Sequence, residues 1–154
     1  MQIDGMGGTH IVTSKVAIIK PSDRSDVDVD YTFAQVGIET ATVGYAGNCG
    51  NISAGVGPFA VNEGLLKESR PGLSLDGKLK TKEVRIYNTG TKKVLISHVP
   101  VDDRTGRALE SGDFSIAGCP GTGAPILMDY TSVRHTRFGI AILLTLTCRS
   151  SAQH

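Results

Sequence analysis

The hydrophobic positions in the first part of the chain predict two strands. Residues 14–20 form a short apolar stretch rich in β-branched side chains, and turn-forming residues end it. We interpret this stretch as a buried strand. Along residues 27–33 apolar and polar side chains alternate, and this period of two predicts a half-buried strand. Its polar positions, which include Asp28 and Asp30, are expected to form a solvated face.

A helical spacing replaces this alternation in residues 51–66. Most of the apolar side chains there recur at intervals of three or four residues. Gly55, Gly57 and Pro58 interrupt the pattern, because glycine and proline disfavour the interior of a helix. We therefore predict a buried, kinked helix whose small residues allow close packing.

The second half of the chain predicts a β-hairpin after a polar surface loop over residues 63–82. Residues 83–88 and 93–101 carry Val and Ile in alternation, and an Asn-Thr-Gly-Thr sequence joins the two runs. Strands that surround one central helix place the chain in the α+β class. Residues 131–154 show no hydrophobic period that continues the sheet, and we do not place this tail in the fold.

Composition narrows the classes of function. A chain of 154 residues with 40% hydrophobic side chains is enough for one domain with a core. The net charge of +1, the low aromatic content of 5% and the lack of tryptophan argue against a nucleic-acid-binding surface. The most apolar run, residues 138–146, is shorter than the about 20 residues of a membrane-spanning helix. We expect no nucleic-acid partner and no membrane association.

The three cysteines, Cys49, Cys119 and Cys148, are far apart and show no CxxC spacing. They indicate neither a disulfide framework nor a zinc site. No secretory signal is recognised at the start of the chain, so a reducing, cytoplasmic compartment is expected. The glycine-rich stretches also lack the endings of nucleotide-binding loops, and we expect no metal, ATP or NAD.

Chemistry is concentrated in the sequence Gly-Asn-Cys-Gly-Asn at residues 47–51, directly before the predicted helix. The N–H groups of a first helical turn have no partner within the helix, so they favour a thiolate or a bound carboxylate. The alternative is a small, buried Cys49 in a packing turn. Lys15, at the start of the first strand, is by itself no more than a solvated strand end.

Four segments resemble the PrpF family, which includes methylitaconate isomerase, aconitate isomerases and oxalomesaconate tautomerase. They are Ile-Asp-Gly-Met-Gly-Gly at residues 3–8, Thr-Ser-Lys-Val at 13–16, Asp-Tyr-Thr-Phe-Ala-Gln-Val at 30–36 and the long cysteine motif at 47–60. The resemblance covers about residues 2–130. It implies the diaminopimelate epimerase fold, in which two similar domains, each a curved sheet around a central helix, clamp a substrate without a cofactor.

The resemblance also implies roles for individual residues. Family members use a lysine and a cysteine as acid and base, and these map onto Lys15 and Cys49. Substrate-binding roles are implied for four residues: Ser14, Asn48, Gly50 and Asn51. The implied substrate is a small polycarboxylate, and the implied reaction moves a carbon-carbon double bond by a 1,3-proton shift.

Departures from the family predict a truncated member. An upstream GGTSKG motif and the second domain are not found, so we expect residues 1–130 to be one incomplete domain with impaired activity. Residues 131–154 match nothing that we recognise in the family, and we interpret them as an artefact of the gene model. The alternative function is a non-catalytic fragment or an accessory binding protein of the same fold.

Overall fold

The structure is a computed structural model that describes residues 9–130 and 141–145. The described chain forms one sheet and two short helices, with these bounds: β1 (Lys15–Pro21), β2 (Val29–Val36), β3 (Val43–Gly44), α1 (Gly50–Ala54), α2 (Val56–Asn62), β4 (Thr81–Asn88), β5 (Lys93–Pro100), β6 (Pro125–Asp129) and β7 (Ala141–Thr145). The strand order is β1-β2-β4-β5-β6-β7. The short strand β3 lies outside this order and pairs with β2.

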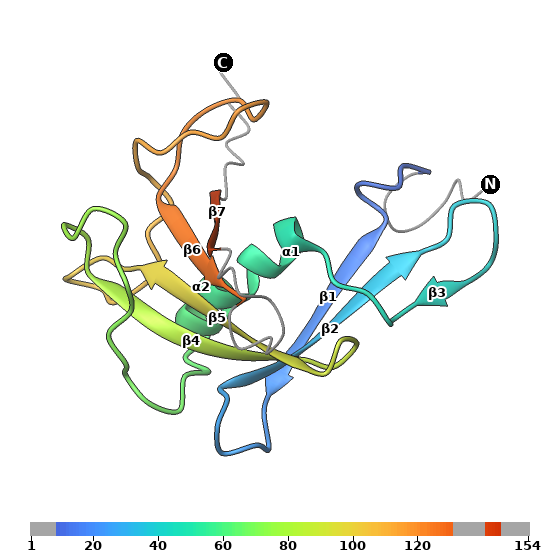
Figure 1. Ribbon diagram of the computed structural model, residues 1–154, viewed down its shortest axis with the longest axis horizontal. Helices are drawn as coiled ribbons and strands as arrows, with labels where there is room; N and C mark the ends of the chain where they lie inside the picture. The colour runs from blue at the N-terminus through green and yellow to red at the C-terminus, as the bar shows by residue number, and fades with distance from the viewer. Residues whose placement is uncertain (1–8, 131–140, 146–154) are drawn as a thin grey trace.

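The sheet is mixed, because β2 and β4 run parallel while every other pair among the described strands is antiparallel. A parallel pair needs a crossover connection, and here α1 and α2 lie on that connection. The sheet curves around the two helices, so that they lie in its hollow (Figure 1). The α+β class and the curved sheet around a central helix are therefore confirmed.

The first predicted strand is present as β1, but it is not buried. It lies at the edge of the sheet and pairs only with β2 among the described strands. Its side chains are partly or fully exposed, and Ile18 is 50% exposed. The prediction that β1 is buried was wrong, because an apolar run does not reveal whether a strand has one neighbouring strand or two.

Asp28 is the clearest correction to the sequence analysis. The prediction placed it on a solvated strand face, but the residue lies just before β2 and is 0% exposed. Its carboxylate accepts the backbone N–H of Lys67 over 3.1 Å and that of Arg85 over 2.8 Å, and it is paired with the guanidinium of Arg70. These partners come from later segments of the chain, which the local alternation does not show.

The predicted helix is present and is broken where glycine was expected to disturb it. Gly55 separates α1 from α2, and the helical part ends at Asn62, before the predicted end at residue 66. Gly57 lies directly on β5: a Cβ added there would be 2.8 Å from both Ser97 Cβ and Val99 Cγ2. A glycine is thus required for the close approach of α2 to the sheet.

The hairpin prediction is confirmed, since β4 and β5 pair in one continuous antiparallel register from Thr81 opposite Pro100 to Asn88 opposite Lys93. One part of the tail was predicted wrongly. The chain returns to the sheet as β7, whose backbone pairs antiparallel with β6. The expectation that the sequence beyond residue 130 does not continue the sheet is therefore incorrect for residues 141–145.

The core lies between the helices and the sheet face that they cover. Alternate residues of the central strands point into it, as the period of two requires. Its buried members include Val29, Tyr31, Phe33, Ala54, Val56, Ala60, Val84, Ile86, Val99 and Met128. Burying one large apolar side chain of this kind contributes roughly 1.5–3 kcal/mol, so this cluster fixes the position of α1 and of the residues before it.

Candidate active site

Cys49 is the N-cap residue of α1, as the sequence predicted. The thiol is free, half-buried and packed against the edge of the core. The chain reaches this position over the sheet and passes near Phe33, since a Cβ on Gly47 would lie in ordinary contact with the Phe33 ring, at 3.5 Å. The cysteine is therefore held at a helix start that itself rests on strand β2.

The side chain of Asn48 anchors the same segment to the hairpin. Asn88 Nδ2 donates to Asn48 Oδ1 over 2.9 Å. Asn88 is fully buried, and its Oδ1 accepts the backbone N–H groups of Gly90 and Thr91. In this structure the side chain of Asn48, directly before Cys49, is thus bonded to the hairpin. This contact comes in addition to the substrate-binding role that the resemblance implies for Asn48.

Lys15 is the first residue of β1 and lies directly opposite Gln35 on β2. Gln35 Nε2 donates to the carbonyl of Ser14 over 2.8 Å, so this side chain holds the strand end that carries Lys15. Ser14 is 0% exposed, and its Oγ has no hydrogen-bond partner. Sequence reasoning did not single out Gln35, although its position within the segment at residues 30–36 was a signal that could have done so.

Strand register places Lys15 and Cys49 over the same face of the sheet. Lys15 shares the face of its partner Gln35, and Gln35 shares it with Phe33, two residues earlier on β2. Phe33 is the residue against which Gly47 passes. Within the described part of the chain, neither the Lys15 ammonium nor the Cys49 thiol has a hydrogen-bond or ion-pair partner.

The predicted carboxylate-binding residues Gly50 and Asn51 form the first turn of α1. Their N–H groups have no acceptor within the helix because they precede its first closed turn. Behind them, Ser53 Oγ donates to the carbonyl of Gly50 and lies 3.1 Å from the hydroxyl of Tyr130. The turn is thus fixed from the core side, while Asn51 is exposed.

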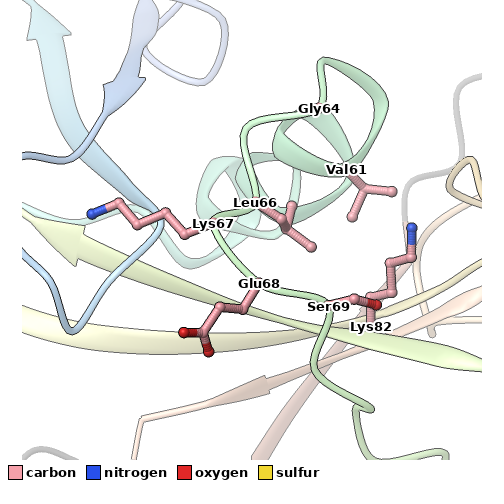
Figure 2. A pocket seen from close by; sticks show the side chains of 7 residues that line it. All are labelled: Val61, Gly64, Leu66, Lys67, Glu68, Ser69 and Lys82. Carbon is pink, nitrogen blue, oxygen red and sulfur yellow. The ribbon is translucent and has the colours of Figure 1, made fainter.

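A separate depression of about 260 Å³ lies at the end of α2. Figure 2 shows that its two lysines, Lys67 and Lys82, extend in different directions instead of converging on one point. None of the predicted site residues lines it. The depression is therefore distinct from the candidate site at Lys15 and Cys49.

Residues 9–130 contain no group of three or more His, Cys, Asp or Glu side chains placed to hold a metal ion. Across the described ranges we also find no helix with the length and hydrophobicity needed to span a bilayer.

A family model described as PrpF protein matches residues 1–145. The chain belongs to the PrpF family. This confirms the family inferred from the glycine-rich and cysteine motifs. The match also runs past residue 130, where the sequence analysis ended the family-like part.

Several PrpF-related proteins are similar to the chain. The 3-methylitaconate isomerase of Eubacterium barkeri is 53% identical over 130 residues, which cover 84% of this chain and 31% of the isomerase. The 4-oxalomesaconate tautomerase of Pseudomonas putida is 43% identical over 152 residues, which cover 99% of this chain and 39% of the tautomerase. The chain thus spans between about a third and two fifths of the length of these relatives.

The fold agrees with an experimental structure of a family member. A crystal structure of methylitaconate-delta-isomerase superposes with a TM-score of 0.71 at 52% sequence identity. The superposition covers 84% of this chain and 31% of that protein. The curved sheet and its helices therefore correspond to one part of a longer isomerase.

Proposed function

We propose that this PrpF chain carries the proton-transfer half-site of an isomerase that moves a carbon-carbon double bond in an unsaturated di- or tricarboxylate. The observation that carries the proposal is the placement of Lys15 and Cys49 over one sheet face, each without a competing partner in the described chain. The names of the similar isomerases and the tautomerase support this class of substrate.

The proposed reaction is a 1,3-proton shift that uses no metal or organic cofactor. One group of the pair accepts an allylic proton, the electrons shift through the conjugated carboxylate, and the other group returns a proton to the carbon two positions away. The double bond moves by one position, and substrate and product have the same composition. The N–H groups of Gly50 and Asn51, which have no acceptor within α1, would hold a carboxylate and stabilise the charge that develops on it.

Surrounding residues keep the two groups in place. Gln35 fixes the strand end at Ser14, and the Asn48–Asn88 bond fixes the residue before Cys49. Effective general acid-base catalysis needs such fixed positions, and it typically contributes 10²- to 10⁴-fold to a rate. Residues 1–154 tested by themselves should turn over substrate more slowly than the longer relatives, because the parts of those relatives that this chain does not match would not help to exclude water.

Exchange of substrate protons with solvent tests the proposal, because it requires only that one group remove the allylic proton and return a deuteron acquired from the solvent. The chain is incubated in D₂O with methylitaconate or aconitate, and deuterium uptake at the allylic carbon is followed by NMR. Exchange at the allylic carbon should fall by about 10²-fold or more in whichever variant, Cys49→Ser or Lys15→Met, lacks the group that removes this proton. Formation of the isomerised product needs both groups and should fall by that factor in both variants.

Matched controls are available on the same chain. Cys119 is exposed and lies outside the segment at residues 47–51, and Lys20 lies on the opposite face of β1 from Lys15, so Cys119→Ser and Lys20→Met should exchange as the unmodified chain does. Exchange by the unmodified chain that is no faster than with the two site variants would refute the proposal and favour a non-catalytic protein.

A further inference from the structure

Tyr31 lies in the middle of β2 with a side chain that is 0% exposed. Its hydroxyl is buried and has no hydrogen-bond partner. A buried hydroxyl without a hydrogen-bond partner lowers stability, and a phenylalanine would fill the same core position without that cost. The hydroxyl therefore calls for a role other than packing.

Two neighbours of Tyr31 on its sheet face, Asn88 and Phe33, lie next to the segment that carries Cys49. Tyr31 pairs in register with Asn88, so the two side chains lie on the same sheet face, and Asn88 holds Asn48. Phe33, the next residue on that face of β2, lies against Gly47. Of the two neighbours of Tyr31, Phe33 thus lies near Gly47 and Asn88 bonds Asn48. Cys49, the next residue along the chain, packs against the core cluster that contains Tyr31.

The other polar groups in this region already have partners. The Tyr130 hydroxyl lies 3.1 Å from Ser53 Oγ, and Ser53 also bonds the carbonyl of Gly50. Asn48 and Asn88 bond one another. Among these groups, the hydroxyl of Tyr31 and the thiol of Cys49 are the two that remain without a hydrogen-bond partner.

The protonation state of Tyr31 suits a donor. Burial, followed by the charges that Cys49 and Tyr130 can carry, raises the pKa of the Tyr31 phenol well above its ordinary value of 10.0. The hydroxyl thus keeps its proton at any pH at which the protein functions. A protonated phenol donates its hydrogen to a neighbouring anion, and such charge-assisted hydrogen bonds are stronger than neutral ones.

We propose that Tyr31 is a positioning residue for Cys49, whose thiolate accepts a hydrogen bond from the buried phenol when the cysteine gives up its proton. The bond would form through a change of the Cys49 side-chain rotamer and would break again when the sulfur is reprotonated. This inference rests on the proposed function, because it gives the thiolate a role in proton transfer. The inference adds a residue, Tyr31, that would contact the sulfur of Cys49 from the core side and would not contact the substrate.

Alkylation of Cys49 tests the inference without any substrate. The rate of reaction with iodoacetamide is measured from pH 5 to 10 in a chain that carries Cys119→Ser and Cys148→Ser, with and without Tyr31→Phe. Loss of the donor should displace the pH profile to higher pH by about one unit, since the thiolate loses a charge-assisted bond. The sulfur would then be intrinsically more nucleophilic by roughly threefold.

The two effects give a distinctive signature. At pH values below the profile's midpoint the rate should fall by about threefold, whereas the plateau at high pH should rise by about threefold. A looser structure that merely exposes the cysteine would raise the rate at every pH. Tyr45→Phe is the matched control, because Tyr45 lies in the same connecting segment, is 52% exposed and should leave the profile unchanged. An unchanged profile in Tyr31→Phe would overturn the inference.

A second measurement does not depend on the folding of Tyr31→Phe. The chain is labelled with 3-fluorotyrosine, and the resonance of Tyr31 is identified as the one least broadened by a soluble gadolinium chelate, since it is the fully buried one of the four tyrosines. This resonance should shift with pH when Cys49 is present and stay constant in Cys49→Ser. A shift of equal size in both chains would overturn the inference.

These outcomes are separable from the fate of the proposed function. If substrate protons do not exchange but Tyr31→Phe displaces the alkylation profile, the isomerase proposal fails and the contact between the phenol and the thiolate stands. If exchange occurs and the profile does not move, the proposed function stands and the role of Tyr31 is refuted.

Discussion

Asn88 donates from Nδ2 to Oδ1 of Asn48 across 40 residues of sequence, over a distance of 2.9 Å. Asn88 closes the hairpin and is fully buried, whereas Asn48 is exposed and precedes the candidate catalytic cysteine. One side-chain hydrogen bond therefore links the most regular part of the sheet to the start of α1. The candidate site takes its position from this link as well as from the helix.

Removal of this link should cost stability. Asn48→Ala leaves the buried donor of Asn88 without its partner, and we expect a loss of about 1–2 kcal/mol in the free energy of unfolding, measured with urea. Asn51→Ala is the control, because the Asn51 side chain is exposed and bonds no described residue, and it should change stability by less than about 0.5 kcal/mol. Equal effects of the two variants would contradict the prediction.

The buried carboxylate of Asp28 should matter more. Asp28→Asn removes the charge that pairs with Arg70 and weakens the acceptor for the N–H groups of Lys67 and Arg85. Breaking a buried ion pair typically costs about 3–5 kcal/mol, because the remaining charge loses its partner. Asp26→Asn provides the comparison, since Asp26 pairs with Arg24 at the surface and should cost less than about 1 kcal/mol. A loss at Asp28 as small as that at Asp26 would show that water reaches the guanidinium.

Gly57 is expected to be intolerant of a methyl group. Its Cβ would lie 2.8 Å from Ser97 Cβ and from Val99 Cγ2, which are fixed by strand β5, so Gly57→Ala should destabilise by about 1–3 kcal/mol or more. Gly44→Ala is the matched substitution in open space, with no atom within 4 Å of the added Cβ, and should be close to neutral. Thermal unfolding of both variants measures the difference, and a stable Gly57→Ala chain would mean that α2 can shift away from the sheet.

His98 should make the fold sensitive to acid. Burial lowers the pKa of His98 below its ordinary value of 6.5, although Glu83 and Asp129 oppose the shift, and its Nδ1 accepts the N–H of Leu73 over 3.1 Å. Between the lowered pKa and 6.5 the unfolded chain binds more protons than the folded chain, so stability falls as the pH falls through that interval. The slope from this group is at most about 1.4 kcal/mol per pH unit.

Urea unfolding at a series of pH values checks the effect of His98. His98→Gln retains an oxygen that can accept the Leu73 N–H but does not titrate, so its stability should depend less steeply on pH below 6.5. The slopes are compared instead of the absolute stabilities, because the substitution also changes packing. Parallel curves for the two chains would assign the acid sensitivity to other groups.

Local patterns accounted for the elements and for the family. The alternation along residues 27–33 and 83–101 and the glycines within residues 51–66 predicted two strand regions, a hairpin and an interrupted helix, because each pattern reports on neighbours within a few residues. The same patterns misjudged β1 and Asp28. An exposed edge strand and a buried carboxylate both depend on what packs against them, and those partners lie far away in the sequence.

The sequence by itself determined the PrpF membership and the cysteine at a helix start, because motif order and helix signals are local properties of the chain. Only the tertiary structure decided that both residues face one side of the sheet, that Gln35 and Asn88 hold their neighbours, and that the Tyr31 hydroxyl is buried without a partner. Strand register and side-chain burial arise from contacts between distant segments, which a single sequence does not encode as a local pattern.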